Sequence, residues 1–539
     1  MLLENIPLPA IQPFASHYLN QDKKVLSNFH YGYNGQEAYN KRLKELQERS
    51  FQRADLADCI EAYMKPLPSS PAVQQSIADL RSDGVVVIGG QQAGLLTGPL
   101  YAIHKVISII QLAKEQSQSL SVPVIPVFWI AGEDHDFMEI NHVYVERDGQ
   151  LNKKGYAERV LDKRMASDTS FEKSSMKKWV RSILRDFGET SHTSVLIEML
   201  DGAIEESASI TDLFAFIIMD LFKEEGLLVI DSADKELRKI EQPFFKRLLD
   251  QSEKITSSVF EQQELLMEDG FHSLIEIEKN AVNLFMTING ERILLFKTPD
   301  GYQDKNGSNK FGHKVLEELI DQSPHLFSNN VVTRPLMQEW LFPSLSFIAG
   351  PGEIAYWAEL KRAFEQLDLT MPPIMPRLNI TIVERDIQQK LTDLNLSIHS
   401  VLKTGVKKEK DQFWSSVKDE AMEEYIEETQ KLIDDQYSKM KQKAEDLHPG
   451  LPAIVEKNLA IHEKQLAYLK RKTNDYLSFK HHVELTKYDQ VESRLIPEDG
   501  PQERIWNVFY FLNKYGIDFA SELVKLNFKF DHDHKVIFV

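Results

Sequence analysis

Short apolar runs and longer amphipathic segments alternate along the first 385 residues. The apolar runs 85–88 and 124–130 are separated by about twenty helical residues that begin near Gly98-Pro99. Two buried strands joined by a helix are typical of a βαβ unit, whose parallel sheet is covered on both faces. Further elements are expected as strands at 227–230, 292–296, 331–333 and 380–383 and as a helix at 355–367. The pattern predicts an α/β fold with a doubly wound, Rossmann-like parallel sheet.

A polar, helix-rich stretch at about 145–210 interrupts this pattern, and we interpret it as an insertion because it exceeds an ordinary crossover. A second insertion is expected at about 262–315. From residue 386 apolar residues recur at alternating spacings of four and three, and this rhythm resumes after the reversal signal His448-Pro449-Gly450. We therefore expect two antiparallel helices of about forty residues each. The predicted domains are a catalytic core at 1–385, an antiparallel coiled-coil arm at 386–502, and a segment at 503–539 that returns to the core.

The second arm helix repeats apolar side chains on one face, at Leu459, Leu466, Leu469 and Tyr476. Such a long apolar stripe is unfavourable in water, so we expect a homodimer formed through the coiled coil. Beyond the arm, alternation at 526–530 and an apolar run at 535–539 predict a terminal hairpin. We assign Asp531-His532-Asp533-His534 to the polar connection of that hairpin, and no metal site is expected.

Charge and composition exclude several classes of partner. The chain has 82 acidic and 63 basic side chains, a net charge of -19, and no basic block, which argues against nucleic acid and against a tRNA-acting ligase. No apolar run reaches the roughly 18 residues that a membrane span needs, and the start lacks a signal-peptide pattern, so a cytoplasmic protein is expected. The single cysteine, Cys59, excludes an intramolecular disulfide and a multi-cysteine zinc site.

The first candidate site is the segment 89–99, which joins a predicted strand to a helix. Open parallel sheets bind ligands at the carboxyl ends of their strands, where glycines admit the ligand and helix N-termini favour anions. An ordinary strand-to-helix turn remains the alternative. The residues predicted to bind substrate here are Gly90, Gln91, Gln92, Thr97, Gly98 and Pro99.

The second candidate site is a row of four ionisable residues, Glu133-Asp134-His135-Asp136, where the strand at 124–130 ends. Carboxylates beside an imidazole can bind an amine or transfer a proton, and His135 is our candidate for the general base. All four are predicted catalytic residues. A helix N-terminal cap with solvated acids would explain the same pattern.

The third candidate site combines Arg334 and Gln338 with a Gly-Pro-Gly-Glu helix start. Arg334 could bind a carboxylate with two hydrogen bonds or form a structural salt bridge, and both interpretations stay open. Gly352, Glu353 and Tyr356 belong to the helix start and are predicted to bind substrate. We expect the acidic row to face Arg334 and Glu353 across the carboxyl edge of the sheet.

Four motifs together resemble the bacillithiol-biosynthesis cysteine-adding enzymes of Gram-positive bacteria. They are Gly-Gly-Gln-Gln-Ala-Gly at 89–94, Trp-Ile-Ala-Gly-Glu-Asp-His-Asp at 129–136, Arg-Pro at 334–335 and Ala-Gly-Pro-Gly-Glu-Ile-Ala-Tyr at 349–356. The resemblance covers the whole chain. It implies a ligase that joins the cysteine carboxyl to the amine of glucosaminyl malate, with a core similar to class I aminoacyl-tRNA synthetases and other nucleotidyltransferases, and a coiled coil that pairs two subunits.

The sequence departs from the synthetase pattern, because it has neither His-x-Gly-His nor a properly placed Lys-Met-Ser-Lys-Ser; Lys173-Ser174-Ser175-Met176-Lys177 lies in the first insertion. ATP with Mg is expected only from chemistry, since a free carboxylate must be activated before it forms an amide. The alternative function is a coiled-coil scaffold that carries a ligand-binding α/β platform. Polar residues gathered at three strand ends favour the enzyme.

Overall fold

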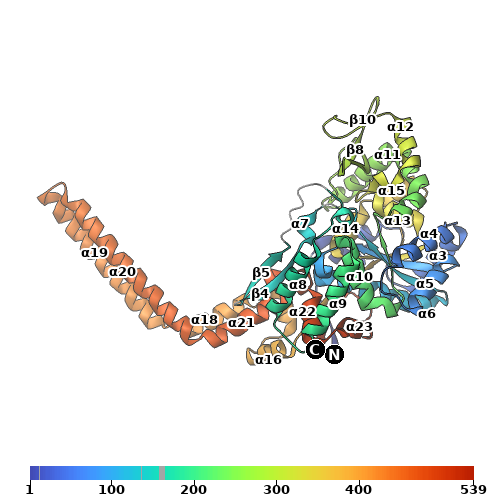
Figure 1. Ribbon diagram of the computed structural model, residues 1–539. Helices are drawn as coiled ribbons and strands as arrows, with labels where there is room; N and C mark the ends of the chain where they lie inside the picture. Colours follow the sequence, from blue (N-terminus) through green and yellow to red (C-terminus); the bar gives the residue numbers. More distant parts are fainter. Residues whose placement is uncertain (11, 135, 148, 157–163) are drawn as a thin grey trace. The chain divides into compact units, whose positions relative to one another are not determined.

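The computed structural model describes residues 1–10, 12–134, 136–147, 149–156 and 164–539 (Figure 1). The chain forms two compact units, one of Met1–Ile382 with Gln502–Ile537 and the other of Val383–Pro501 with Phe538–Val539. Among the described helices, none is both long and apolar enough to cross a bilayer.

A five-stranded parallel sheet lies at the centre of the first unit, in the order β13-β12-β2-β3-β6. Its strands are β2 (Val85–Gln91), β3 (Val124–Ile130), β6 (Leu228–Asp231), β12 (Ser344–Ala349) and β13 (Ile374–Pro376). The order runs from β2 through β3 to β6 on one side and through β12 to β13 on the other. The topological switch point, where such sheets bind ligands, therefore lies between β2 and β12. The predicted Rossmann-like α/β fold is confirmed.

Helix α6 (Leu100–Leu120) connects β2 to β3, as the apolar pattern predicts. It starts directly after Pro99, whose fixed φ suits a helix start, and ends at Leu120, which is followed by Ser121 in a left-handed conformation. The other helices of this unit are α1 (Pro13–Leu19), α2 (Lys23–Leu26), α3 (Gln36–Glu48), α4 (Arg53–Met64), α5 (Pro71–Arg81), α7 (Phe137–Ile140), α8 (Lys173–Phe187), α9 (Thr193–Glu206), α10 (Ile210–Phe222), α11 (Lys235–Glu268), α12 (His313–Gln322), α13 (Thr333–Leu341), α14 (Pro351–Ala358), α15 (Lys361–Gln366), α22 (Val508–Tyr515) and α23 (Phe519–Val524).

The remaining strands form separate sheets. An antiparallel sheet has the order β10-β9-β8-β7-β11, a three-stranded sheet has the order β1-β15-β14, and β4 pairs with β5. Their bounds are β1 (Leu2–Ile6), β4 (His142–Arg147), β5 (Gln150–Gly155), β7 (Ala281–Ile288), β8 (Glu291–Thr298), β9 (Gly301–Gln303), β10 (Lys310–Phe311), β11 (Phe327–Asn329), β14 (Ile380–Val383) and β15 (His534–Phe538). The strands predicted at 292–296 and 380–383 thus exist, but outside the parallel sheet.

The strand predicted at 331–333 is wrong. Helix α13 starts there because the side chain of Asn330 accepts hydrogen bonds from the backbone N–H groups of Val332 and Thr333, at 2.9 and 3.1 Å. This capping overrides the β-branched character of the run. Strand β12, which lies between β13 and β2 in the parallel sheet, follows α13 and was not predicted.

Two other predicted elements differ from the structure. The helix expected at 355–367 is two helices, α14 and α15, with Glu359 and Leu360 between them. The terminal hairpin is also wrong: residues 526–530 form no strand, and β15 instead lies between β1 and β14. Lys535 on β15 donates its backbone N–H to Asn379 at 2.8 Å, so strand pairing over a long sequence separation replaced the local turn.

The second unit is helical, with α16 (Arg385–Asp393), α17 (Ile398–Thr404), α18 (Lys407–Val417), α19 (Glu420–Leu447), α20 (Leu451–Lys480) and α21 (His482–Leu495). The predicted continuous helices of about forty residues are shorter: α19 has 28 residues and α20 has 30. The apolar repeat predicted from residue 386 onward is interrupted between α16 and α17, where Asn395 has a positive φ and Ser397 caps the next helix.

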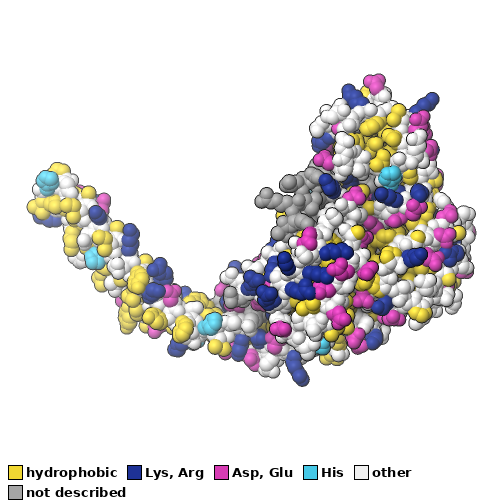
Figure 2. Space-filling view, viewed as in Figure 1, with side chains coloured by type: hydrophobic (Ala, Val, Ile, Leu, Met, Phe, Trp, Pro, Cys, Tyr) yellow, Lys and Arg dark blue, Asp and Glu magenta, His cyan; other side chains and the backbone are white. Residues whose placement is uncertain are grey.

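Helices α19 and α20 form an antiparallel hairpin. Lys441 pairs with Glu456 at 2.5 Å near the turn, and Glu427 pairs with Lys470 at 3.4 Å farther along both helices. Figure 2 shows hydrophobic side chains distributed over its surface. The most exposed of them are Tyr425, Leu432, Leu447, Ile454, Tyr476 and Phe479.

Candidate active site

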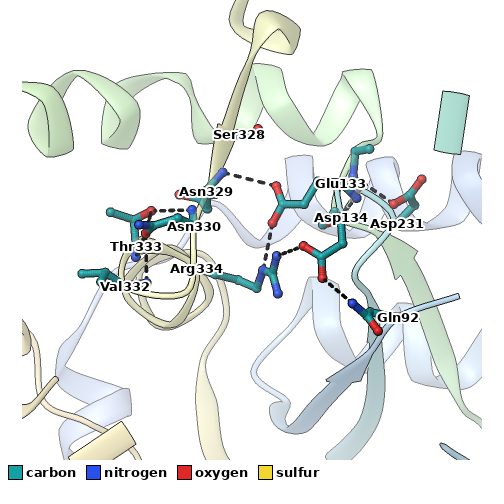
Figure 3. A network of polar contacts seen from close by, with 12 residues as sticks. Gln92, Glu133, Asp134, Asp231, Ser328, Asn329, Asn330, Val332, Thr333 and Arg334 are labelled. Atoms are coloured by element: carbon teal, nitrogen blue, oxygen red, sulfur yellow. Dashed lines mark hydrogen bonds and ion pairs between the residues drawn. The ribbon is translucent and has the colours of Figure 1, made fainter. Parts of the chain in front are cut away.

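Glu133 follows β3 and is the centre of a buried ionic network (Figure 3). Its carboxylate accepts hydrogen bonds from Arg238 at 2.5 Å, from Arg334 at 2.8 Å and from the backbone N–H of Asn329 at 3.2 Å. Burial alone would raise its pKa, but the charges of Arg238, Arg334 and Arg292 lower the pKa to about 2. The geometry therefore favours a positioning role for Glu133 over proton transfer.

Asp134 and Arg334 form the more accessible rim of the network. Arg334 donates to Asp134 at 2.5 Å, and their side chains are 22% and 24% exposed. Gln92 contacts Asp134 at 3.5 Å and Glu139 at 3.0 Å, so the segment after β2 meets the segment after β3. Arg334 is thus held by two carboxylates, yet both it and Asp134 can be reached by a ligand.

A second polar group lies at the switch point between β2 and β12. The ammonium group of Lys105 on α6 donates to Gly90 O at 2.7 Å, to Gln91 Oε1 at 3.3 Å and to Glu353 Oε2 at 2.5 Å. Burial lowers the pKa of Lys105, and the charge of Glu353 opposes that shift. Glu353 also accepts the backbone N–H of Gly350 at 2.6 Å, so a protein carboxylate occupies part of the helix N-terminus that we expected to attract a ligand.

Arg377 and Glu503 border this second group. Arg377 follows β13 and forms two hydrogen bonds with Glu503, at 2.5 and 2.7 Å. His104 Nδ1 lies 2.8 Å from the same carboxylate. Burial alone would raise the pKa of Glu503, but Arg377 and then His104 hold it well below its usual range. The ion pair joins the sheet edge to the segment that follows the helical unit.

Asp231 closes β6 beside Glu133 (Figure 3). It accepts hydrogen bonds from Ser167 Oγ at 2.5 Å and from Ala233 N at 2.9 Å. A Cβ atom on Gly132 would lie 2.2 Å from its Oδ1, so only glycine fits where the chain leaves β3. Burial raises the pKa of Asp231 to about 7, which makes it a carboxyl group that titrates near neutral pH.

Tyr356 on α14 links the two polar groups electrostatically. Burial raises its pKa, the charges of Glu353 and Asp134 add to the shift, and the charge of Arg334 opposes it. The pKa of this one phenol is therefore shifted by charged residues of both polar groups. The structure brings together Gln91, Gln92, Glu133, Asp134, Arg334, Glu353 and Tyr356 at one edge of the parallel sheet.

Other predicted site residues lie elsewhere or have local roles. His135 lies outside the described residues. Asp136 is exposed and caps α7 by accepting the N–H of Met138 at 3.2 Å, as in the capping alternative. Gln338 is buried on α13, and Gly352 is exposed in the first turn of α14.

Thr97, Gly98 and Pro99 lie where the chain turns into α6. Thr97 is 1% exposed and Gly98 is buried, so neither lies on an open surface. Pro99 forms an isolated bridge with Asn507. These residues form the turn that connects the segment after β2 to α6.

The sequence interpretation missed Lys105, Arg238, Asp231, Arg377 and Glu503. A signal existed for Lys105, because His104 and Lys105 interrupt the apolar run of α6 at buried positions. The other four become neighbours of the site only through tertiary contacts.

One further group could hold a metal ion. Asp250, His313 and Glu317 offer ligand atoms that all lie within 4.8 Å of one another. They are on α11 and α12, and His313 Nε2 already pairs with Asp250 at 3.1 Å. This group does not include any predicted site residue.

The fold and the site define a class of protein: a Rossmann-like α/β protein whose polar site lies at the carboxyl edge of a parallel sheet and whose chain adds a helical hairpin unit. Family models identify the particular family. The N-terminal Rossmann-like domain of bacillithiol biosynthesis BshC matches residues 1–378, and its C-terminal coiled-coil domain matches residues 380–539. The chain belongs to the BshC family of bacillithiol biosynthesis.

Full-length relatives agree with this assignment. Proteins named "Putative cysteine ligase BshC" from Geobacillus kaustophilus (strain HTA426) and Geobacillus thermodenitrificans (strain NG80-2) are 41% and 40% identical to this chain. One from Bacillus cereus (strain AH187) is 39% identical. Each alignment covers 100% of both proteins, so the similarity includes the helical unit as well as the sheet.

Proposed function

We propose that this protein is a ligase that joins the carboxyl group of cysteine to the amine of glucosaminyl malate. The name of its full-length relatives supports a cysteine ligase. The observation that carries the proposal is the Arg334–Asp134 pair, two opposite charges that are reachable at the carboxyl edge of the sheet. A guanidinium suits a malate carboxylate, and a carboxylate suits an ammonium group.

The attacking amine must lose a proton before it meets an activated acyl group, and we assign His135 as the general base. Glu133 would hold Arg334 in place, because the buried carboxylate fixes the guanidinium through Nε. Asp134 would bind the ammonium form of the amino sugar. In this arrangement the second polar group, around Lys105, keeps the loops after β2 and β12 together.

ATP with Mg²⁺ is the activating co-substrate in this proposal, because amide formation from a free carboxylate needs a leaving group. Glu139 is an exposed carboxylate beside the site, and it contacts Gln92 at 3.0 Å. Carboxylate oxygens are the protein ligands that Mg²⁺ uses beside substrate phosphates. The carboxylate of Glu139 would suit a Mg²⁺ ion that accompanies ATP bound near Gln92.

Calorimetric titration with glucosaminyl malate, cysteine and ATP separately, followed by mass spectrometry of the complete mixture, tests the proposal. We expect glucosaminyl malate to bind to the protein. We expect the mass of the amide product to be detected only when cysteine and ATP are both present. Arg334→Gln should weaken glucosaminyl malate binding at least about tenfold, as for a lost charged hydrogen bond. Arg362→Gln is the matched control, because that arginine pairs with Glu261 on the surface. No product from the complete mixture would refute the ligase.

We also propose a homodimer formed through the helical hairpin. Exposed aromatic and aliphatic side chains along α19 and α20 support it, because a surface stripe of this kind is usually covered by a partner. A second copy offers the same stripe with two-fold symmetry.

A further inference from the structure

The turn before α6 has an unusual backbone. Leu96, Thr97 and Gly98 are consecutive residues with positive φ, of 50°, 70° and 69°. Glycine tolerates this region, but a β-branched threonine is strongly disfavoured there. Such strain persists only where the surrounding structure imposes it, and it concentrates at functional sites.

Thr97 gains no hydrogen bond of its own from this conformation. Its hydroxyl group is buried, and it has no hydrogen-bond partner among the described residues. A buried hydroxyl without a partner is itself destabilising. The conformation must therefore be imposed by groups outside Thr97.

Asn507, which follows the helical unit in the sequence, supplies those contacts. Its amide Nδ2 donates to Leu96 O at 2.8 Å and to Gly98 O at 2.6 Å. Its Oδ1 accepts the N–H of Phe509 at 2.8 Å, so the same side chain also caps α22. The backbone adds a hydrogen bond from Leu100 N to Trp506 O at 2.8 Å. One asparagine thus bridges both ends of the left-handed turn.

The held turn leads directly to residues of the candidate site. A Cβ on Gly94 would lie 2.7 Å from Gly98 Cα, so the segment between them closes tightly on itself. Upstream of this closure, Gln91 contacts Lys105 and Gln92 contacts Asp134. Relaxing the turn would shift both glutamines, and displacements of about 1 Å can reduce activity about a hundredfold.

We infer that Asn507 is a positioning residue of the active site, which fixes the left-handed turn at Leu96–Gly98 and thereby places Gln91 and Gln92. The inference rests on the proposed function for its substrate, glucosaminyl malate. It predicts that the C-terminal segment contributes to substrate binding without touching the substrate.

The test uses the full-length protein with Asn507→Ser, because serine can still cap α22 but cannot bridge the two carbonyl groups. Asn513→Ser is the matched control: Asn513 is equally buried on α22 and bonds Gly188 O at 2.6 Å and Thr193 Oγ1 at 2.7 Å, away from the turn. Melting temperatures compare the general cost of the two changes. Hydrogen exchange of the backbone from Gln91 to Leu100 reports the turn, and calorimetry reports glucosaminyl malate affinity.

We expect Asn507→Ser to speed exchange in this segment and to weaken glucosaminyl malate at least about tenfold, while Asn513→Ser changes neither beyond twofold. Adding Thr97→Gly to Asn507→Ser should restore part of the exchange protection, because glycine adopts positive φ without strain. Equal effects of the two serine variants, or no restoration by Thr97→Gly, would overturn the inference. If the wild-type protein fails to bind glucosaminyl malate, the proposed substrate is wrong, and the exchange data still decide the role of Asn507.

Discussion

The carboxyl edge of the parallel sheet and the helical hairpin differ in which side chains they bury: the sheet edge buries paired charges, and the hairpin exposes apolar groups. At the sheet edge, charged groups such as Glu133 and Arg238 are at most 1% exposed and have partners within the chain. Along α19 and α20, apolar groups such as Leu432 and Tyr476 are 65% and 75% exposed. The first region pairs its described charges within the chain, whereas the second exposes apolar surface of the kind that partners cover. Changes in the first should therefore affect folding and chemistry, and changes in the second should affect assembly.

The largest effect is expected from Glu133→Gln. The change removes the carboxylate that the buried Arg238 and the partly exposed Arg334 share, which should lower the free energy of unfolding by about 3–5 kcal/mol in chemical denaturation. Glu241→Gln is the control, because Glu241 also bonds Arg238 but burial raises its pKa to about 7. Glu241→Gln should lower the free energy of unfolding by less than Glu133→Gln does. Equal costs would show that Glu133 is not the special partner of the arginines.

The low pKa of Glu133 also gives this stabilisation a pH dependence. Its pKa lies below the unfolded value of 4.5, so the contribution is complete above about pH 4.5 and is lost as the pH falls toward 2.

Asp231→Asn should have the next largest effect, with the opposite dependence on pH. The pKa of Asp231 rises from 3.8 to about 7 on folding, so the folded state holds its proton between these values and loses stability as pH rises. One pKa unit corresponds to about 1.4 kcal/mol. The difference in the free energy of unfolding between the Asn variant and the wild type should therefore be more favourable to the variant at pH 8 than at pH 4, by up to about 4 kcal/mol. Thermal unfolding of both proteins across pH 4–8 measures this. Parallel curves would contradict it.

His135→Asn should reduce turnover by about a hundredfold or more and change substrate affinity little, because asparagine keeps a polar side chain but removes the titratable group. Product formation under saturating substrates and calorimetric affinity separate the two effects. Near-normal turnover would assign the general base to another residue.

The smallest effect on the protein itself is expected in the hairpin. Leu466→Glu combined with Leu469→Glu should raise the dimer dissociation constant at least about tenfold in sedimentation, with unchanged thermal stability of the sheet unit, because charge is placed in an apolar interface. Lys464→Glu on the same helix is the control for charge alone. A wild-type protein that is monomeric at micromolar concentration would remove the basis of this prediction.

Local sequence predicted the parts of the fold whose signals are local. The run predicted at 124–130 is β3, and the predicted helix of about twenty residues before it is α6, whereas β2 extends beyond the predicted run 85–88 to Gln91. The strand expected at 331–333 failed because one asparagine side chain started a helix there. Helix caps act through single hydrogen bonds, which periodicity does not register.

The candidate site shows the same division. The acidic row was predicted to face Arg334 and Glu353; Glu133 and Asp134 form direct ion pairs with Arg334, whereas Glu353 pairs with Lys105. Arg238, the other partner of Glu133, lies on a helix 105 positions along the chain from it. Because such a partner is one polar residue on an amphipathic helix, only the folded structure distinguishes it from a solvated charge.

The pair of Arg377 with Glu503 also bears on the order in which the protein is made. These residues are 126 positions apart, and the whole helical unit is synthesised between them. At roughly 5–20 residues per second, Arg377 leaves the ribosome about 6–25 s before its carboxylate partner. During that interval the nascent sheet holds a guanidinium destined for burial without its counter-ion. A chain truncated within the hairpin would keep every strand of the parallel sheet but would leave Arg377 without this counter-ion.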